Sequence, residues 1–318
     1  MGILTKKRHL EVMKIPSKVY PYRIPYMGSK QNIAYSLMMA IVQKKPKAKY
    51  FFDIFGGGCS MSLMAKQFDM KVYYTEKNKG IVNLLNFLKD NKIPKEWIKW
   101  IDREEFKKCL DKDDPYSVFI SVVWSFGNNR KAYLFGKDVE ERKRLAFEII
   151  VNNDYDSLSK LQEITNLKLK MPRSNDLHKR RLEFSKQIKN IKGFERGCPE
   201  LIQIQSLSQL ECCSRLQQLE YLQQLEYLNN LNLPYDEVII YCDPPYRNTA
   251  EYVDDGFNPE EFDNWVRKLK YDVFISEYEC PFEKIASFGK MSLLNNSKDK
   301  KPLISEKLFF HKSEITKE

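Results

Sequence analysis

Histidine is scarce in this chain, and its cysteines lack the spacings that metals or disulfides require. There are 3 histidines and 7 cysteines among 318 residues, with no Cys-x-x-Cys pair. The sequence therefore predicts no metal site, and the odd number of cysteines favours a reducing cytoplasm. No apolar run approaches the roughly 20 residues that cross a bilayer, and the first residues lack the apolar core of a signal peptide. We therefore expect a cytoplasmic protein with no membrane partner.

Positive charge is in excess. The chain has 53 Lys and Arg against 43 Asp and Glu, a formal net charge of +10. Such an excess favours a polyanionic partner, because basic side chains release counterions when they bind phosphates. An ordinary basic surface explains the excess equally well. Hydrophobic residues make up 42% of the chain, which is enough for a buried core and excludes a disordered polymer.

Apolar runs of strand length alternate with helical patterns. Residues 49–54 and 70–75 are predicted strands, and the helical spacing of 60–68 lies between them. Strand, helix and strand in this order indicate a βαβ unit and a parallel sheet. The sheet is expected to resume with three later strands, at 237–242, 272–276 and 306–310, and with a helix at 259–269.

The middle of the chain differs in character. Residues 95–200 are rich in Lys, Arg, Asp and Asn with aromatics among them, which indicates an insertion into the α/β sheet. After it, leucine recurs every third residue over 207–231, with one position taken by Cys213. Three residues turn a helix by about 300°, so these leucines would wind around the axis instead of forming one stripe. A helix packed between surfaces, a broken helix and an oligomerisation element all remain open.

A glycine-rich turn follows the first predicted strand. In the segment 53–58, Asp53 precedes three glycines, which let the backbone approach a ligand at the start of a helix. A dinucleotide site, a flavin site and a simple turn all fit this pattern. A dinucleotide fingerprint needs glycine where Met61 stands, and an acid before the glycines suits a cationic amino group better than a pyrophosphate. Glu76, at the end of the next strand, is either a ribose acceptor or an ordinary strand-end acid.

Asp243-Pro244-Pro245-Tyr246 follows the buried run 237–242 and is the most informative segment. The prolines fix the backbone and leave carbonyl groups free to accept hydrogen bonds. If Asp243 and the Pro244 carbonyl accept the two hydrogens of an adenine N6 amino group, its lone pair turns toward an incoming methyl group. Tyr246 can stack on the base. A tight Pro-Pro turn is the alternative, but it leaves the acid and the aromatic ring unexplained.

These segments, in this order, resemble the DNA adenine methylase (Dam) family of N6-adenine methyltransferases. The matching segments are Tyr26-Met27-Gly28-Ser29-Lys30, Asp53-x-Phe55-x-Gly57, Glu76-Lys77-Asn78, Arg103-Glu104-Glu105-Phe106, Trp124-Ser125-Phe126-Gly127-Asn128, Asp243-Pro244-Pro245-Tyr246, Ile275-Ser276 and Glu306-Lys307-Leu308. The chain departs from the family at Cys59, where a second glycine is usual. It departs also at Pro234-Tyr235, where the family often has Asp-Phe or Ser-Tyr.

The resemblance implies an α/β fold. A Rossmann-like, S-adenosyl-L-methionine-dependent methyltransferase sheet would comprise residues 1–80 and 200–318, with an inserted, mostly helical target-recognition domain at 81–199. The implied catalytic residues are Asp243, Pro244 and Tyr246. The implied residues of the S-adenosyl-L-methionine site are Tyr26, Lys30, Asp53, Phe55, Gly57, Glu76, Tyr235 and Asp243, and those of the DNA site are Asn128, Asn129, Arg130 and Lys131.

The implied partners are double-stranded DNA, whose target base must be flipped out, and a companion restriction endonuclease if the enzyme is not solitary. Three alternatives stay open: the same fold acting on RNA adenine, the same fold acting on N4 of DNA cytosine, and a catalytically inactive DNA-binding module.

Overall fold

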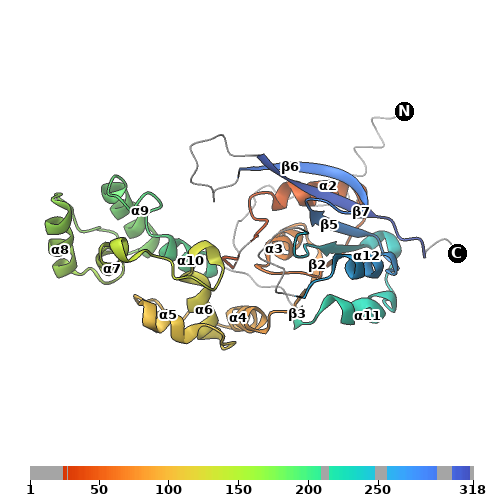
Figure 1. Cartoon of the computed structure of the whole chain (residues 1–318), viewed down its shortest axis with the longest axis horizontal. Helices are drawn as coiled ribbons and strands as arrows, with labels where there is room; N and C mark the ends of the chain where they lie inside the picture. Colours follow the sequence, from red (N-terminus) through yellow and green to blue (C-terminus); the bar gives the residue numbers. More distant parts are fainter. Residues whose placement is uncertain (1–23, 27, 209–214, 248–255, 292–302, 316–318) are drawn as a thin grey trace. The chain divides into compact units, whose positions relative to one another are not determined.

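The chain folds around a seven-stranded sheet. The computed structural model describes residues 24–26, 28–208, 215–247, 256–291 and 303–315. The strands are β1 (Tyr50–Asp53), β2 (Lys71–Glu76), β3 (Arg215–Gln218), β4 (Val238–Cys242), β5 (Val273–Glu277), β6 (Glu283–Met291) and β7 (Leu303–His311). Figure 1 shows them together in one part of the chain, with helices α2, α3, α11 and α12 around them.

Several helices begin at a capping side chain. The α-helices are α2 (Ala34–Lys44), α3 (Ser60–Gln67), α4 (Lys79–Asp90), α5 (Arg103–Cys109), α6 (Pro115–Val123), α7 (Lys137–Asn152), α8 (Tyr155–Thr165), α9 (Leu177–Ile188), α10 (Pro199–Ser208), α11 (Leu225–Asn229) and α12 (Pro259–Arg267). Short 3₁₀ helices are η1 (Lys95–Trp97), η2 (Phe126–Asn128), η3 (Tyr221–Gln224) and η4 (Tyr235–Glu237). Asp114 and Asn258 each accept a backbone N–H at a helix start, and proline follows each of them.

The sheet is mostly parallel, as the sequence predicted. Its order is β3-β2-β1-β4-β5-β7-β6; the first five strands are parallel, whereas β7 is antiparallel to both β5 and β6. This mixed α/β arrangement is compatible with a Rossmann-like fold. The sequence had not predicted β3 or β6. Strand β3 carries two glutamines, and its place at the edge of the sheet explains why it lacks an apolar run.

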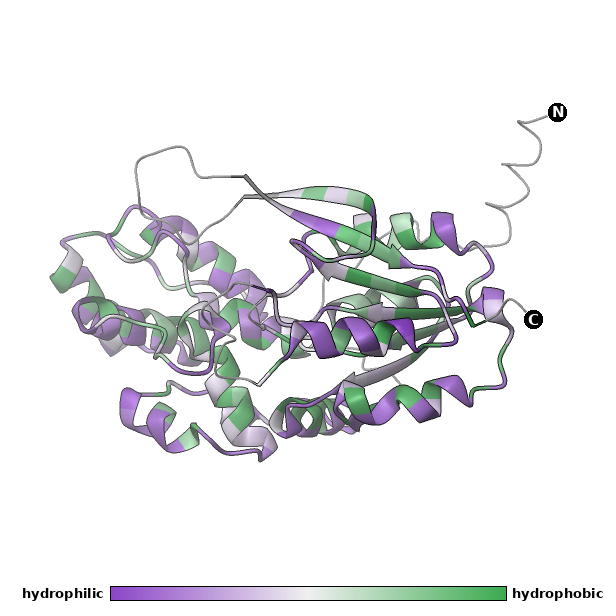
Figure 2. Cartoon of the chain, turned by 45° about the vertical axis from the view of Figure 1, so that its right-hand side comes forward, coloured by the Kyte–Doolittle hydropathy of each residue, from purple (hydrophilic) through white to green (hydrophobic). Residues whose placement is uncertain are grey.

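Alternation along the strands sends side chains to two faces of the sheet. Phe52, Ile240 and Ile275 join one hydrophobic core with residues of α11 and α12. Their neighbours in sequence, Asp53 and Tyr241, therefore project to the other face, where Asp53 contacts α3. In Figure 2 hydrophobic residues fill much of the strands, which fits a sheet that is covered on both faces.

The described residues divide into two compact units. The first contains the whole sheet and comprises described residues of Lys30–Val82 and Cys212–Glu318. The second comprises Asn83–Glu211 with described residues of Tyr22–Ser29, and its described elements are almost entirely helical. Large apolar side chains that are fully buried, among them Trp124, Phe147 and Ile150, form its core. In sequence, the second unit lies between β2 and β3.

The leucine repeat does not form a single helix. Leu207 lies in α10, residues 209–214 are outside the described part, and the chain then forms β3, η3 and α11 in turn. The tripeptide Leu-Gln-Gln is a strand at 216–218 and part of a 3₁₀ helix at 222–224. Gln224 is buried and hydrogen bonds to Thr75 of β2. Tertiary contacts, and not the three-residue period, therefore decide the local structure.

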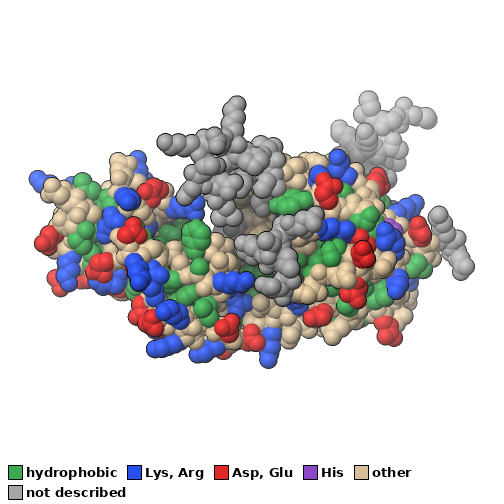
Figure 3. Space-filling view, in the orientation of Figure 1, with side chains coloured by type: hydrophobic (Ala, Val, Ile, Leu, Met, Phe, Trp, Pro, Cys, Tyr) green, Lys and Arg blue, Asp and Glu red, His purple; other side chains and the backbone are tan. Residues whose placement is uncertain are grey.

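Both units carry charged surfaces. Figure 3 shows Lys and Arg side chains over both parts of the chain on the face drawn, interspersed with Asp and Glu. Among the described residues, no helix combines the length and the apolar character needed to pass through a bilayer.

Candidate functional site

The strand order reverses between β1 and β4. From β1 the chain continues outward to β2 and β3, whereas β4 continues to β5 on the other side. Ligands of open α/β sheets bind at such a switch point, beyond the carboxyl ends of the strands. Asp53 is the last residue of β1, and Asp243 directly follows β4. Both predicted acids therefore lie at the place where this class of sheet binds its ligand.

Asp53 is almost completely buried. Its side chain accepts hydrogen bonds from the backbone N–H of Ser62 at 3.1 Å and from the Ser62 hydroxyl at 2.6 Å, and the residue is 1% exposed. Burial, with smaller contributions from the charges of Asp243 and Glu76, raises the pKa of Asp53 to about 7, although the two bonds from Ser62 lower it. A cationic ligand beside Asp53 would favour the ionised carboxylate.

The glycine turn brings its backbone against β2. A side chain at Gly56 would lie 2.1 Å from the ring of Tyr74, so only glycine fits there. The Tyr74 hydroxyl donates to the Gly57 carbonyl at 2.8 Å. Cys59 has φ 67°, a left-handed conformation that glycine adopts without strain and that costs other residues roughly 1–2 kcal/mol. The departure from the family pattern at Cys59 therefore falls on a strained position.

Glu76 closes the same turn from the neighbouring strand. One of its carboxylate oxygens accepts the N–H of Gly57 and the other accepts the N–H of Asn78, both at 2.9 Å. Glu76 thus orders the glycine turn from the end of β2.

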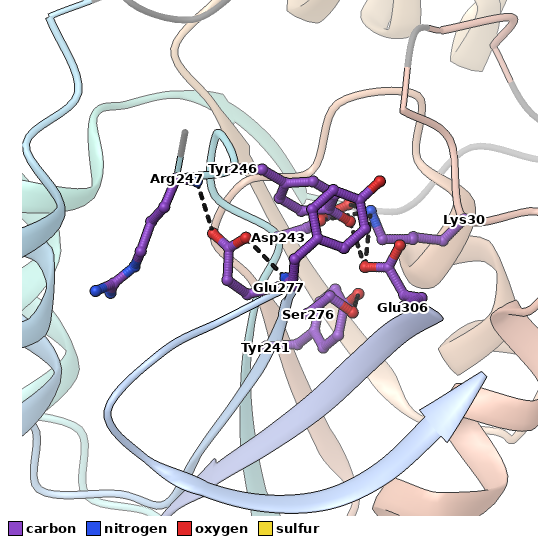
Figure 4. Close-up of polar contacts among 9 residues, drawn as sticks. Lys30, Tyr241, Asp243, Tyr246, Arg247, Ser276, Glu277 and Glu306 are labelled. Carbon is purple, nitrogen blue, oxygen red and sulfur yellow. Dashed lines mark hydrogen bonds and ion pairs between the residues drawn. The ribbon is translucent and has the colours of Figure 1, made fainter. Parts of the chain in front are cut away.

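The ammonium of Lys30 contacts the segment Asp243-Pro244-Pro245-Tyr246. Its Nζ atom is 2.6 and 2.7 Å from the two carboxylate oxygens of Asp243 and 4.8 Å from the centre of the Tyr246 ring (Figure 4). The Tyr246 hydroxyl donates to Glu306. Burial and the charges of Asp243 and Glu306 raise the pKa of Tyr246 well above its usual value, so the phenol keeps its proton. The structure thus brings Lys30, Asp243 and Tyr246 together.

Two acids that the sequence had not singled out for the site complete it. Glu277 ends β5, accepts the N–H of Arg247 at 3.3 Å and of Tyr278 at 2.8 Å, and is 1% exposed. Burial, with a smaller contribution from Asp243, raises its pKa to about 7. Glu306 of β7 is fully buried. The sequence could have predicted Glu277, because it is an acid at the end of a strand, as Asp53 and Glu76 are, and Asp243 directly follows a strand.

Other predicted cofactor residues lie elsewhere. Tyr235 precedes β4 and bonds to Asp272, which directly precedes β5, so it lies at the amino-terminal edge of the sheet. Five strand residues, or about 17 Å, separate that edge from the Asp243 edge. The Phe55 ring packs in an aromatic cluster with Phe262 on the α12 face. Tyr26 groups with the second unit.

The four predicted DNA-binding residues form one loop of the second unit. The side chain of Asn128 donates to the Val122 carbonyl, and that of Asn129 accepts the N–H groups of Lys131 and Ala132. Arg130 is partly buried, donates from Nε to Ser121 at 3.1 Å, and has its pKa lowered by burial. These side chains shape the loop. Lys131 and the neighbouring Phe126 are exposed.

No cluster of three or more His, Cys, Asp and Glu side chains suited to a metal ion occurs within the described ranges. Comparison with known protein families and with curated proteins finds no match to this chain. Any functional conclusion therefore depends on the fold and on the geometry of the site.

Proposed function

We propose that this chain is an S-adenosyl-L-methionine-dependent methyltransferase that acts on N6 of adenine in double-stranded DNA. The observation that carries the proposal is the placement of acids at the carboxyl edge of four neighbouring parallel strands. These acids are Glu76, Asp53, Asp243 and Glu277. The segment Asp243-Pro244-Pro245-Tyr246 lies beside the switch point among them.

The charge of this edge supports the proposed cofactor. A dinucleotide would bring a pyrophosphate to acids that are already held close together, which is electrostatically unfavourable. S-adenosyl-L-methionine instead carries an ammonium and a sulfonium, and Asp53 is the carboxylate best placed to receive the ammonium. Glu76, at the end of the neighbouring strand β2, would accept the ribose hydroxyls. The residues present therefore fit the proposed cofactor.

The chain's own residues would orient the acceptor. Asp243 and the Pro244 carbonyl accept the two N6 hydrogens, and Tyr246 stacks on the base. The bound cofactor would supply a methyl group that is activated by its positive sulfur. The methyl group would leave the sulfur as N6 takes it, and Asp243 would accept the proton that N6 loses and pass it to water. Electrostatic stabilisation and positioning account for the rate without a covalent intermediate.

The second unit would bind the DNA. A net charge of +10 supports binding to a polyanion, and the loop with Lys131 and Phe126 offers an exposed cation and an exposed aromatic ring. Extruding the target base costs roughly a few kcal/mol, which contacts to phosphates and to the flipped base must offset. We propose this unit as the target-recognition domain, with a restriction endonuclease as a possible companion.

One assay tests the proposal and its alternatives. The protein is incubated with tritium-labelled S-adenosyl-L-methionine and with duplex DNA, single-stranded DNA or RNA, and the labelled nucleoside is identified. Labelled N6-methyladenine from duplex DNA supports the proposal. Label in RNA adenine or at N4 of cytosine would assign the enzyme a different acceptor. DNA binding without methyl transfer would indicate an inactive DNA-binding module.

The catalytic assignment is tested with a matched pair of variants. Asp243→Ala should lower the transfer rate by at least about 100-fold, as the loss of a group that stabilises the transition state does. Asp236→Ala removes an exposed aspartate at the other edge of the sheet, which pairs with Lys47, and should leave the rate unchanged. Near-normal transfer by Asp243→Ala would refute the role of this residue.

A further inference from the structure

The ammonium of Lys30 occupies the position that the substrate's amino group would need. It bonds to both carboxylate oxygens of Asp243 and lies against the ring of Tyr246. Under the proposed function, Asp243 accepts a hydrogen of the adenine N6 amino group and Tyr246 stacks on the base. The chain's own ammonium therefore competes with the substrate, and it must leave Asp243 before the base can bind.

Glu306 lies on the other side of this ammonium. Its Oε1 atom accepts the Tyr246 hydroxyl and is 3.7 Å from Lys30 Nζ (Figure 4). Its Oε2 atom is buried, and no described residue donates a hydrogen bond to it. A fully buried carboxylate with an unsatisfied oxygen is unfavourable unless another group can approach it. This residue therefore has unused capacity for a cation.

We propose that Glu306 is a positioning residue that receives Lys30 when the substrate amino group takes Asp243. This inference rests on the proposed methyltransferase function. A movement of about 1 Å would shorten the 3.7 Å separation to a normal ion pair. Lys30 carries three N–H donors and can exchange one carboxylate for the other without losing its proton. After the exchange Lys30 is paired with Glu306, and Asp243 accepts hydrogen bonds from the neutral amino group of the substrate.

The need for such a partner follows from burial. Lys30 is 3% exposed, so an ammonium displaced from Asp243 cannot gain full hydration where it lies. A buried cation without a counterion is strongly unfavourable. Without the negative charge of Glu306, a substrate amine would displace Lys30 at a higher cost in free energy. A base that lacks the amino group would not displace Lys30, and its binding would be unaffected.

Glu306→Gln isolates this charge, because the amide oxygen still accepts the Tyr246 hydroxyl. Glu277→Gln is the matched control: it removes another buried acid near Asp243, but Glu277 bonds to backbone N–H groups and not to Lys30. Once the methylated position has been read from treated DNA, two duplexes are made, with adenine or with unsubstituted purine at that position. Dissociation constants and methylation kinetics are then measured for each protein.

Glu306→Gln should weaken binding of the adenine duplex at least about tenfold and raise KM more than it lowers kcat. Binding of the purine duplex should change less than about twofold, and Glu277→Gln should not discriminate between the duplexes. In a Lys30→Met background, Glu306→Gln should add no further penalty. Equal effects on both duplexes, or no effect on either, would overturn the inference. If the unaltered protein methylates no nucleic acid, the proposed function itself fails.

Discussion

Replacing Asp53 by asparagine should make the protein more stable at high pH while weakening its binding of the proposed cofactor, S-adenosyl-L-methionine. The carboxylate is 1% exposed, and its pKa is raised to about 7 from 3.8, chiefly by burial. An ionised Asp53 is therefore a source of instability in the ligand-free fold. Asparagine keeps the shape and an acceptor oxygen for Ser62 but cannot ionise.

Proton linkage gives the direction and the size of the change in folding stability with pH. Between pH 4 and pH 7 the folded state holds a proton on Asp53 that the unfolded chain has released, so stability falls as pH rises through this window. A rise in pKa from 3.8 to about 7 corresponds to at most about 4 kcal/mol at pH 8. Asp53→Asn removes this loss of stability. The difference in free energy of unfolding between the variant and the unaltered protein should therefore be larger at pH 8 than at pH 4 by up to about 4 kcal/mol.

Thermal unfolding at pH 4, 6 and 8 measures this difference. Asp236→Asn, at an exposed surface position, serves as the control and should change stability by less than about 0.5 kcal/mol at each pH. The difference in melting temperature between Asp53→Asn and the unaltered protein should widen with pH. A constant difference across this range would refute the assignment of a raised pKa to Asp53.

The same linkage predicts how cofactor binding depends on pH. An ammonium needs the ionised carboxylate, and the raised pKa of about 7 keeps Asp53 mostly protonated at pH 5, so affinity should fall by up to about 100-fold from pH 8 to pH 5. Binding near pH 6 should release a proton from Asp53, which calorimetry in two buffers of different ionisation enthalpy detects. Asp53→Asn should bind weakly at every pH; tight binding would contradict the ammonium contact.

Gly56→Ala should destabilise the protein by about 1–3 kcal/mol, because the added methyl group overlaps the buried ring of Tyr74, and chemical denaturation measures the loss; an unchanged midpoint would show that the turn relaxes. Tyr235→Phe should cost about 1 kcal/mol through a lost hydrogen bond yet leave cofactor affinity intact, and isothermal titration separates the two effects. Lys131→Ala should reduce the slope of log affinity for DNA against log salt by about 1. Arg130→Ala should lower DNA methylation and leave cofactor binding unchanged; unaltered kinetics on DNA would exclude it from recognition.

Local patterns were sufficient for the centre of the fold. The apolar runs that end at Asp53 and Glu76, and the run before Asp243, identified three adjacent parallel strands, because buried strands need such runs. The same reasoning missed β3, which lies at the edge of the sheet and pairs with β2. Its residues Leu216 and Gln217 belong to a repeat with no strand period.

Contacts between distant parts of the chain were beyond local patterns. The resemblance of its segment to a family motif assigned Lys30 to the cofactor site, but no local pattern predicts that its ammonium contacts Asp243, 213 residues away. Tyr235 was placed beside the cofactor by its position before the motif, although a strand carries such a residue to the opposite edge of the sheet. The antiparallel pairing of β7 with β5 brings the Glu306 side chain beside Tyr246, and no local pattern predicts this pairing.

The insertion between β2 and β3 also shapes how the protein is made. Strand β1 pairs with β4, so Tyr50 can pair with Val238 only after Val238 has left the ribosome. At synthesis rates of roughly 5–20 residues per second, this interval is on the order of 10–40 s. During that time β1 and β2 form at most a two-stranded fragment with open edges, whereas the helical second unit forms mainly local contacts and can fold at once. The sheet that carries the site is therefore completed last, and its exposed early strands are the part of the nascent chain most in need of a chaperone.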